Sequence, residues 1–515
     1  MKRALILLFL LAKTVILSAA PQNILLIIAD DYGVDSSSLY NSTNSGASLP
    51  PTPNIVSLAQ SGVLFRNAYA NPVCSPTRAT ILTGRHGFRT GIGDVIAMGS
   101  PALTAAEYTF PEAFAANSGL GYSLAQFGKW HLANGLNAPN TIGGWPHFAG
   151  SLQGAISSYT NWTKTVNGVS TANYTNYATT DLVNDAVAWI QARGTNAWFA
   201  WVAFNSPHTP LHKPPNDLHS YDALSGTQMN INANPRPYYE AMVEAMDTEI
   251  GRLLTAVGPT NTHIIFIGDN GTPNNLLQPP FPSGRGKNSL YEGGIHVPFI
   301  IAGPSVTSPG RTNDTPINAV DLFSTILELA EINVSATVPT NITIDSQSLL
   351  PLLQTDSTLS RYAYSESFNE SAPANSDGRA LRNGQFKLIK FRDGREEFYD
   401  LNVDPYEGTN LLSRVLNAAE KGNYYNLLLK MTEFQNGLPP TIITGLTKND
   451  FQFSITIQRT TNLSYALWRA AKLDALAWLP LTNAVITTNG AATVTLADSN
   501  AILSESFYRV VANAP

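Results

Sequence analysis

The sequence predicts an α/β fold in which a sheet of buried strands is flanked by helices. Three continuous apolar runs, residues 23–29, 197–204 and 262–268, are typical of strands buried on both faces, as in a parallel sheet. Two segments with apolar residues at helical spacing, 181–192 and 239–257, lie between them. Strands that alternate with amphipathic helices indicate an α/β domain large enough for an extensive core.

The first strand ends in two acidic residues, Asp30 and Asp31. The carboxyl ends of strands in open α/β sheets are where ligands bind. An Asp-Asp pair is more often a solvated turn, but two adjacent carboxylates inside a protein are costly to hold together unless a cation lies between them. The third strand ends in a similar way, with Asp269 and Asn270. Carboxylate and amide oxygens suit Ca²⁺ or Mg²⁺, whereas zinc would favour histidine and cysteine ligands.

Shorter elements follow the first strand. A helix is expected over 53–62 and a strand over 63–69, which leads to Cys74, the single cysteine of the chain. Pro76 marks the first turn of a helix, so Cys74 is expected where unpaired backbone N–H groups favour an anion. Arg78, one turn further on, could share that anion. A lone cysteine is more often a small buried core residue, and composition alone leaves that alternative open.

The next elements in chain order are a helix over 111–116 and a strand over 122–128. This strand delivers Lys129 and His131 to its carboxyl end. Residues 133–180 are rich in Asn, Thr, Ser and Gly and are predicted to be loops. The strand over 197–204 leads to His208, which stands between two prolines and is therefore expected to be held in place yet accessible.

The C-terminal part has a different pattern. Short strands are expected over 385–391 and 397–401, and a Gly-Leu-Pro-Pro break follows at 437–440. Beyond it, apolar and polar residues alternate over 451–458, which predicts a strand with one buried face. We therefore expect four parts, namely a signal peptide (1–20), an α/β domain (21–355), a C-terminal subdomain (356–437) and an all-β module (441–515).

Composition and the N-terminus limit the partners and the location. The net charge of -6 and the absence of a basic bias argue against a nucleic-acid partner. Residues 1–20 combine a basic start, an apolar stretch interrupted by Lys13 and small residues at positions 18–20. These features predict a cleaved signal peptide, hence a secreted or periplasmic protein. Lys13 and the short length argue against a membrane anchor, and we expect no stable membrane insertion.

The sequence Cys-Ser-Pro-Thr-Arg at 74–78, followed by Leu-Thr-Gly at 82–84, resembles the signature of the formylglycine-dependent sulfatases, with Thr77 in place of the usual serine. The resemblance implies that a formylglycine-generating enzyme converts Cys74 to formylglycine during maturation. It also implies an alkaline-phosphatase-like fold, with a mixed sheet flanked by helices and a small antiparallel sheet in a C-terminal subdomain.

Three further motifs are similar to those of the same family. They are Gly-Lys-Trp-His-Leu at 128–132, Pro-His-Thr-Pro at 207–210, and Lys287 ahead of Tyr-Glu-Gly-Gly at 291–294. The resemblance implies that the metal ligands, for Ca²⁺ or alternatively Mg²⁺, are Asp30, Asp31, Asp269, Asn270 and the modified Cys74. It implies that the catalytic residues are Cys74, Arg78, Lys129, His131, His208 and Lys287, of which Lys129, His208 and Lys287 also bind substrate.

The implied reaction is hydrolysis of a sulfate monoester of an aryl alcohol or a carbohydrate. Hydrated formylglycine would attack sulfur in line while the basic side chains neutralise the sulfate oxygens. His208 or Lys287 would protonate the leaving alcohol, and His131 would act as the base that releases sulfate. Two alternatives stay open: a related phosphonate or phosphate ester hydrolase, which can use the same nucleophile motif, and a catalytically silent glycan-binding relative.

Overall fold

The computed structural model describes residues 21–97, 101–258, 260–369 and 371–436, together with a set of strands between residues 443 and 513. The expected signal peptide (1–20) and the Gly-Leu-Pro-Pro segment at 437–440 lie outside the described residues. Contacts divide the chain into two compact units, Met1–Ala418 and Ala419–Pro515. Within the described ranges, every helix is too short or too polar to cross a lipid bilayer.

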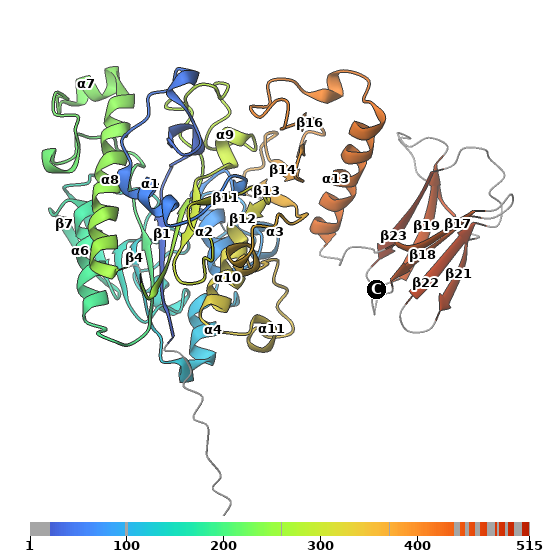
Figure 1. The fold of residues 1–515 in the computed structure, drawn as a ribbon, viewed down its shortest axis with the longest axis horizontal. Helices are drawn as coiled ribbons and strands as arrows, with labels where there is room; N and C mark the ends of the chain where they lie inside the picture. Colours follow the sequence, from blue (N-terminus) through green and yellow to red (C-terminus); the bar gives the residue numbers. More distant parts are fainter. Residues whose placement is uncertain are drawn as a thin grey trace, which may run out of the picture. The chain divides into compact units, whose positions relative to one another are not determined.

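The first unit is built on a mixed ten-stranded sheet, so the predicted α/β class is confirmed (Figure 1). The strands, in spatial order, are β11 (Arg311–Asn313), β2 (Gly62–Phe65), β10 (Phe299–Ala302), β9 (Thr262–Gly268), β1 (Asn23–Ala29), β8 (Trp198–Ala203), β4 (Ser123–Lys129), β5 (Phe148–Ser151), β6 (Trp162–Val166) and β7 (Val169–Tyr174). The central strands β9, β1, β8, β4 and β5 are parallel, and antiparallel strands extend the sheet on both sides.

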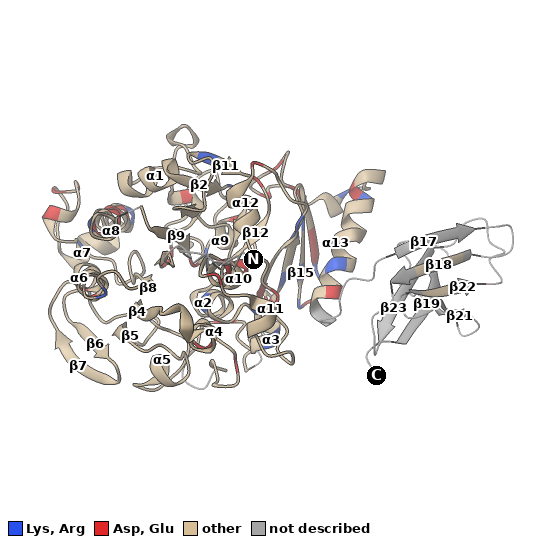
Figure 2. Ribbon diagram, turned by 60° about the horizontal axis from the view of Figure 1, so that its bottom comes forward, with Lys and Arg blue, Asp and Glu red and all other residues tan. Residues whose placement is uncertain are grey.

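Helices cover both faces of this sheet (Figure 2). One face carries α1 (Pro53–Gln60), α6 (Ala178–Gln191) and α8 (Pro235–Val257); the other carries α2 (Cys74–Thr83), α4 (Phe110–Ala116) and α10 (Leu322–Leu329). Successive side chains of β1 therefore enter two separate cores. One core contains Ile24, Leu26 and Ile28, and the other contains Leu25, Ile27 and Ala29. Because both faces are buried, the strand reads as an unbroken apolar run.

Smaller elements complete the first unit. A second sheet, antiparallel and four-stranded, is formed by β13 (Ala363–Ser367), β14 (Gly378–Arg382), β15 (Phe386–Phe391) and β16 (Glu396–Asp400), and a two-stranded parallel pair by β3 (Ala68–Tyr69) and β12 (Ile317–Asn318). The short helices are α3 (Gly87–Thr90), α5 (Ala138–Thr141), α7 (Gln228–Ala233), α9 (Glu292–Ile295), α11 (Val334–Thr337) and α12 (Leu350–Gln354).

The second unit begins with most of α13 (Ala418–Asn436) and is otherwise β-structure. One antiparallel sheet has the order β17 (Ile443–Lys448), β18 (Phe453–Gln458), β22 (Thr493–Asp498), β21 (Val485–Asn489), and a second has the order β20 (Leu479–Pro480), β19 (Ser464–Ala470), β23 (Phe507–Asn513). A small apolar core contains Ile455, Leu467, Val494 and Leu496.

Two predictions of local structure were wrong. Residues 133–180 are not all loops, because they contain β5, β6, β7 and the short helix α5. The strand expected over 63–69 is interrupted at Arg66 and Asn67, and its second part, β3, pairs with β12 instead of joining the main sheet. The chain leaves one sheet and enters another within these few residues.

Candidate active site

The register of the sheet brings four strand ends to one edge. Ala29 of β1 pairs with Gly268 of β9, Ile28 pairs with Ala203 of β8, and Ala203 pairs with Gly128 of β4. The polar residues that follow these strands therefore start from neighbouring positions. They are Asp30 and Asp31, Asp269 and Asn270, the segment containing His208, and the pair Lys129 and His131.

Three buried carboxylates at this edge each face a basic side chain. The ion pairs, given with their N–O distances, are Lys129–Asp30 at 2.5 Å, Lys287–Asp31 at 2.5 Å and Arg78–Asp269 at 2.8 Å. Arg78 also donates from Nε to the same Asp269 oxygen at 3.1 Å and from Nη1 to the carbonyl of Lys129 at 3.0 Å. Three negative and three positive charges thus lie together with little solvent around them.

The pKa values of two of these carboxyl groups shift in opposite directions. Burial alone would raise the pKa of Asp30, but Lys129, together with His208, Arg78 and Lys287, outweighs it and holds the pKa well below its usual range. Burial, with the Asp30 charge, raises the pKa of Asp269 to about 7 in spite of Arg78. A further positive charge at this position would therefore be stabilising.

Two oxygens at this edge have no hydrogen-bond partner within the described part of the chain. Both are fully buried side-chain atoms, Asp30 Oδ1 and Asn270 Oδ1. The amide of Asn270 donates from Nδ2 to Asp31 Oδ1 at 2.7 Å, which leaves its own oxygen free. Burying an oxygen without a partner is costly, and free carboxylate and amide oxygens are the ligands of a hard cation. The residues present therefore fit a divalent cation.

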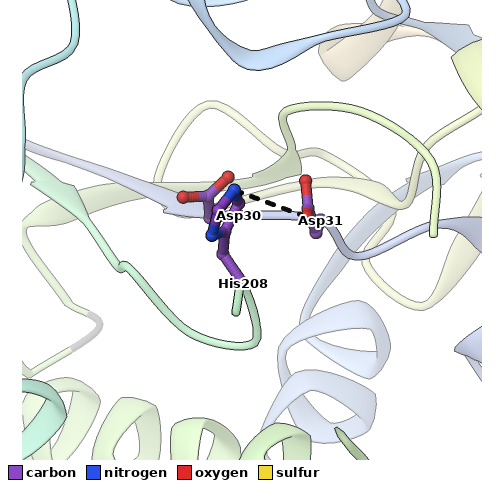
Figure 3. Close-up of side chains that lie close together, drawn as sticks. All are labelled: Asp30, Asp31 and His208. Carbon is purple, nitrogen blue, oxygen red and sulfur yellow. Dashed lines mark ion pairs between the residues drawn. The ribbon is translucent and has the colours of Figure 1, made fainter. Parts of the chain in front are cut away.

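His208 joins the carboxylates at this place (Figure 3). Ligand atoms of Asp30, Asp31 and His208 all lie within 4.8 Å of one another, and His208 Nε2 is 3.8 Å from Asp31 Oδ2. Nδ1 of His208 donates to the carbonyl of Thr209 at 2.8 Å, which leaves Nε2 facing the site. The Tyr159 hydroxyl contacts the carbonyl oxygens of Asn205 at 2.6 Å and His208 at 2.8 Å, so it supports this segment.

Cys74 is the first residue of α2, and only 1% of it is exposed. The helix begins where the proline of the motif predicted it, and it ends at Gly84, whose left-handed φ of 70° a glycine adopts freely. The Sγ atom lies 3.1 Å from His131 Nδ1. Burial raises the pKa of the Cys74 thiol although Lys129 opposes this, so an unmodified thiol here would stay neutral and weakly nucleophilic.

His131 is oriented by both ring nitrogens. Nε2 lies 3.2 Å from the carbonyl oxygen of Ile96. A carbonyl only accepts, so Nε2 carries the hydrogen and Nδ1 presents a lone pair to residue 74. Burial, with the charges of Lys129 and Arg78, lowers the pKa of His131 to about 3, which keeps the ring neutral. The unprotonated Nδ1 of the neutral ring therefore faces residue 74.

The structure brings the predicted site residues to this edge. Asp30, Asp31, Arg78, Lys129, His208, Asp269, Asn270 and Lys287 are linked by direct contacts, and Cys74 and His131 form an adjoining pair. The Sγ atom of Cys74 makes its hydrogen-bond contact with His131. Sequence reasoning missed Ile96, which contacts the His131 ring, and Tyr159, which supports the His208 segment and lies in the stretch expected to be loops.

Comparisons with known proteins agree with this architecture. A family model described as Sulfatase matches residues 22–332, more than half of the chain, and a model described as N-sulphoglucosamine sulphohydrolase, C-terminal, matches residues 286–432. The chain is 28% identical over 471 residues to human arylsulfatase A, a match that covers 78% of this chain and 85% of that protein.

A bacterial relative matches over a shorter stretch. The uncharacterized sulfatase YdeN of Escherichia coli is 29% identical over 338 residues, 59% of this chain and 57% of YdeN, so the chain matches little more than half of that protein. Among solved structures, Ps i-CgsB in complex with k-i-k-neocarrahexaose has the same fold, with a TM-score of 0.66, 24% identity and coverage of 81% of this chain and 93% of that one. The expected alkaline-phosphatase-like fold is thereby confirmed, and the chain belongs to the sulfatase family.

Proposed function

We propose that this chain hydrolyses sulfate monoesters of carbohydrates or small aryl alcohols, with a modified Cys74 as the nucleophile. The observation that carries the proposal is the position of Cys74, buried at the start of α2 with His131 Nδ1 at 3.1 Å, beside a cluster of three buried ion pairs. Similarity to arylsulfatase A and the carbohydrate complex of Ps i-CgsB supports this choice of substrate classes.

The proposal includes two groups that the chain would hold. A formylglycine-generating enzyme would convert Cys74 to formylglycine, and Asp30, Asp31, Asp269 and Asn270, with the modified residue, would hold a calcium ion or alternatively magnesium. When bound, these groups supply a hydroxyl nucleophile and the positive charge that lowers its pKa.

The side chains of the protein provide the remaining chemistry. Arg78, Lys129 and Lys287 place positive charge beside the sulfate oxygens while negative charge shifts toward the leaving oxygen. His131 Nδ1 accepts a proton from residue 74, and the leaving oxygen takes a proton from His208 or Lys287. The side chains of Arg78 and Lys129 are 0% exposed, whereas those of His208 and Lys287 are 17% and 13% exposed. The substrate is therefore expected to approach from the side of His208 and Lys287.

Charge alone does not separate a sulfatase from a phosphatase. The three ion pairs cancel, so a divalent cation leaves the site with a net charge of roughly +2. A sulfate ester carries one negative charge and a phosphate monoester nearly two at neutral pH, and such a site would attract both. The choice of sulfate rests on membership of the sulfatase family and on the sulfatase-like motifs around Lys129, His208 and Lys287.

The test uses full-length protein produced together with a formylglycine-generating enzyme and loaded with Ca²⁺. Aryl sulfate, phosphate and phosphonate esters with the same leaving group are assayed beside sulfated monosaccharides. We expect the highest kcat/KM for a sulfate ester and, by peptide mass spectrometry, an aldehyde or its hydrate at position 74. Cys74→Ala should remove turnover and preserve the fold, because it deletes one small buried side-chain atom.

Each alternative predicts a different result. A clear preference for the phosphate or phosphonate would identify the related ester hydrolase. Full activity with unmodified Cys74 would exclude the formylglycine mechanism. Aldehyde-containing, metal-loaded protein that binds sulfated sugars but hydrolyses no ester would identify a silent glycan-binding relative.

A further inference from the structure

Ser75 lies between the nucleophile helix and the histidine that faces it. Its side chain is fully buried at the second position of α2. The hydroxyl donates to the backbone carbonyl of His131 at 3.0 Å and accepts the backbone N–H of Ile96 at 3.1 Å. One hydroxyl therefore joins α2 to two segments that are separate in sequence.

These contacts form a closed ring with the bond that orients His131. The carbonyl of Ile96 accepts from His131 Nε2 at 3.2 Å, and the amide of the same residue donates to Ser75. Ser75 thus holds Ile96 in place, and Ile96 in turn orients the His131 ring. Without the hydroxyl, the Ile96 amide would lose its hydrogen bond within the described residues, which favours rotation of this peptide away from Ser75.

The backbone of His131 also needs support. Its φ of 54° lies in the left-handed region, which is strained for a residue other than glycine. Two backbone contacts hold it there, the bond from Ser75 to its carbonyl and its own N–H bond to Leu152 at 3.1 Å. Loss of the first would allow the backbone, and with it the ring, to relax.

Gly154 lies against the other side of the ring. A Cβ atom at this position would come within 2.4 Å of His131 Cε1 and 2.6 Å of Nε2. The φ of Gly154 lies outside the left-handed region, so an alanine there meets no left-handed strain. The imidazole is therefore confined by a glycine on one side and by the Ser75–Ile96 bridge at its Nε2 end.

We propose that Ser75 is a positioning residue that, through Ile96, keeps Nδ1 of His131 directed at residue 74. This positioning role rests on the proposed function only where it is tested by kinetics. The loss of Ser75 would allow the ring to turn and Nδ1 to move from the nucleophile, while the basic side chains that hold sulfate stay in place. We therefore expect the loss of Ser75 to lower kcat with little change in KM.

The kinetic test compares Ser75→Ala, Ser75→Thr and Gly154→Ala in full-length, Ca²⁺-loaded enzyme. Because Ser75 lies within the maturation motif, rates are divided by the aldehyde content measured by mass spectrometry. We expect kcat per aldehyde to fall by about 10- to 100-fold in Ser75→Ala and Gly154→Ala, with KM within about threefold of wild type. Ser75→Thr keeps the hydroxyl and should recover kcat to within about threefold.

Thr83→Val is the matched control. It removes another fully buried hydroxyl from the same helix, one that bonds to the carbonyl of Ala79 at 2.8 Å and the amide of Arg85, away from His131. Its kcat per aldehyde should equal that of wild type. An equal loss in Thr83→Val, or a Ser75→Ala enzyme within about twofold of wild type, would overturn the proposal.

A measurement independent of turnover completes the test. In protein labelled with ¹⁵N-histidine, the His131 signals, assigned with His131→Gln, should show the Nε2–H tautomer in wild type and a mixture in Ser75→Ala. The other seven of the eight histidines report whether the fold is kept. Should wild type hydrolyse no ester, the proposed function fails, yet this spectrum still decides the positioning role. An unchanged His131 tautomer in Ser75→Ala would overturn it.

Discussion

Asp31 adopts a left-handed backbone conformation, with φ 68°, at the point where β1 ends. In a regular strand the side chains of Asp30 and Asp31 would point to opposite faces of the sheet. The turn at Asp31 instead lets both carboxylates contact residues of the site. Its cost, on the order of 1–3 kcal/mol, is offset by bonds from the Asp31 amide to Asp269 at 3.1 Å and from the Tyr239 hydroxyl to the Asp31 carbonyl at 2.8 Å. The strain is thus part of what builds the proposed cation site.

Asp31→Asn should remove the bound metal. The substitution keeps the shape of the side chain but deletes the charge that faces Lys287 and the Asn270 amide. We expect Ca²⁺ affinity to fall at least about tenfold, with loss of most turnover. Elemental analysis and calorimetric titration measure this directly, and Asp314→Asn, at an exposed carboxylate, is the matched control. Stoichiometric metal in Asp31→Asn, or full zinc occupancy of wild type, would contradict the proposed ligand set.

At this scale, the motifs identified which residues gather at the site but not how they pair. Arg78 and Asp269 are 191 positions apart, and Lys287 and Asp31 are 256 apart. Such pairs follow from the order and register of the strands, which no local pattern encodes. The sequence predicted that His208 contacts substrate, but it did not predict that this residue lies beside Asp30 and Asp31. The sequence motif includes Ser75, but no sequence pattern indicated its two hydrogen-bond partners, His131 and Ile96.

Among the elements, β13 contains a buried acid outside the site, Glu366. Burial raises its pKa to about 7, although the Phe88 amide donates to it at 2.8 Å and the Tyr364 hydroxyl at 2.9 Å. The unfolded chain loses this proton near pH 4.3. Between roughly pH 4.3 and 7 the folded state holds more protons than the unfolded state, so stability falls as pH rises.

Glu366→Gln should remove this pH dependence. From pH 5 to pH 8 we expect the wild-type free energy of unfolding to drop by roughly 2–3 kcal/mol more than that of the variant, since glutamine does not titrate. Urea unfolding at both pH values measures the difference. Glu328→Gln, at an exposed position of α10, should behave like wild type. Equal pH dependence in wild type and Glu366→Gln would show that the carboxyl is ionised in the folded protein.

The strands that the sequence predicted well are buried on both faces of the sheet. The run at 262–268 coincides with β9, and the run at 23–29 with β1. The missed strands β5, β6 and β7 lie at one edge of the sheet. In β7 the first five residues are exposed and the sixth is half-buried, so the strand has no apolar face and resembles a polar loop. Its pairing with β6, which itself joins the sheet through β5, fixes its structure.

In the whole molecule, the candidate site residues all belong to one of the two units. Every candidate catalytic or metal-binding residue lies between Asp30 and Lys287, inside the first unit. The second unit has its own sheets and its own small core. The family matches end at residue 432, before the first strand of the all-β module. Nothing in the proposed chemistry therefore draws on residues beyond that point.

Removal of residues 439–515 should leave catalysis on a small substrate intact. The cut falls after α13, so the part matched by the C-terminal family model is retained. Because the site residues and the sheet that positions them are kept, we expect kcat/KM on a soluble aryl sulfate within about twofold of the full-length enzyme. The two proteins are compared at equal aldehyde and metal content, with thermal unfolding as the check on folding. On a sulfated polysaccharide, a higher KM for the shortened protein alone would assign glycan binding to the module, and equal values would make it a spacer. Loss of aryl sulfatase activity in a shortened protein that stays folded would show that the module helps to complete the active site.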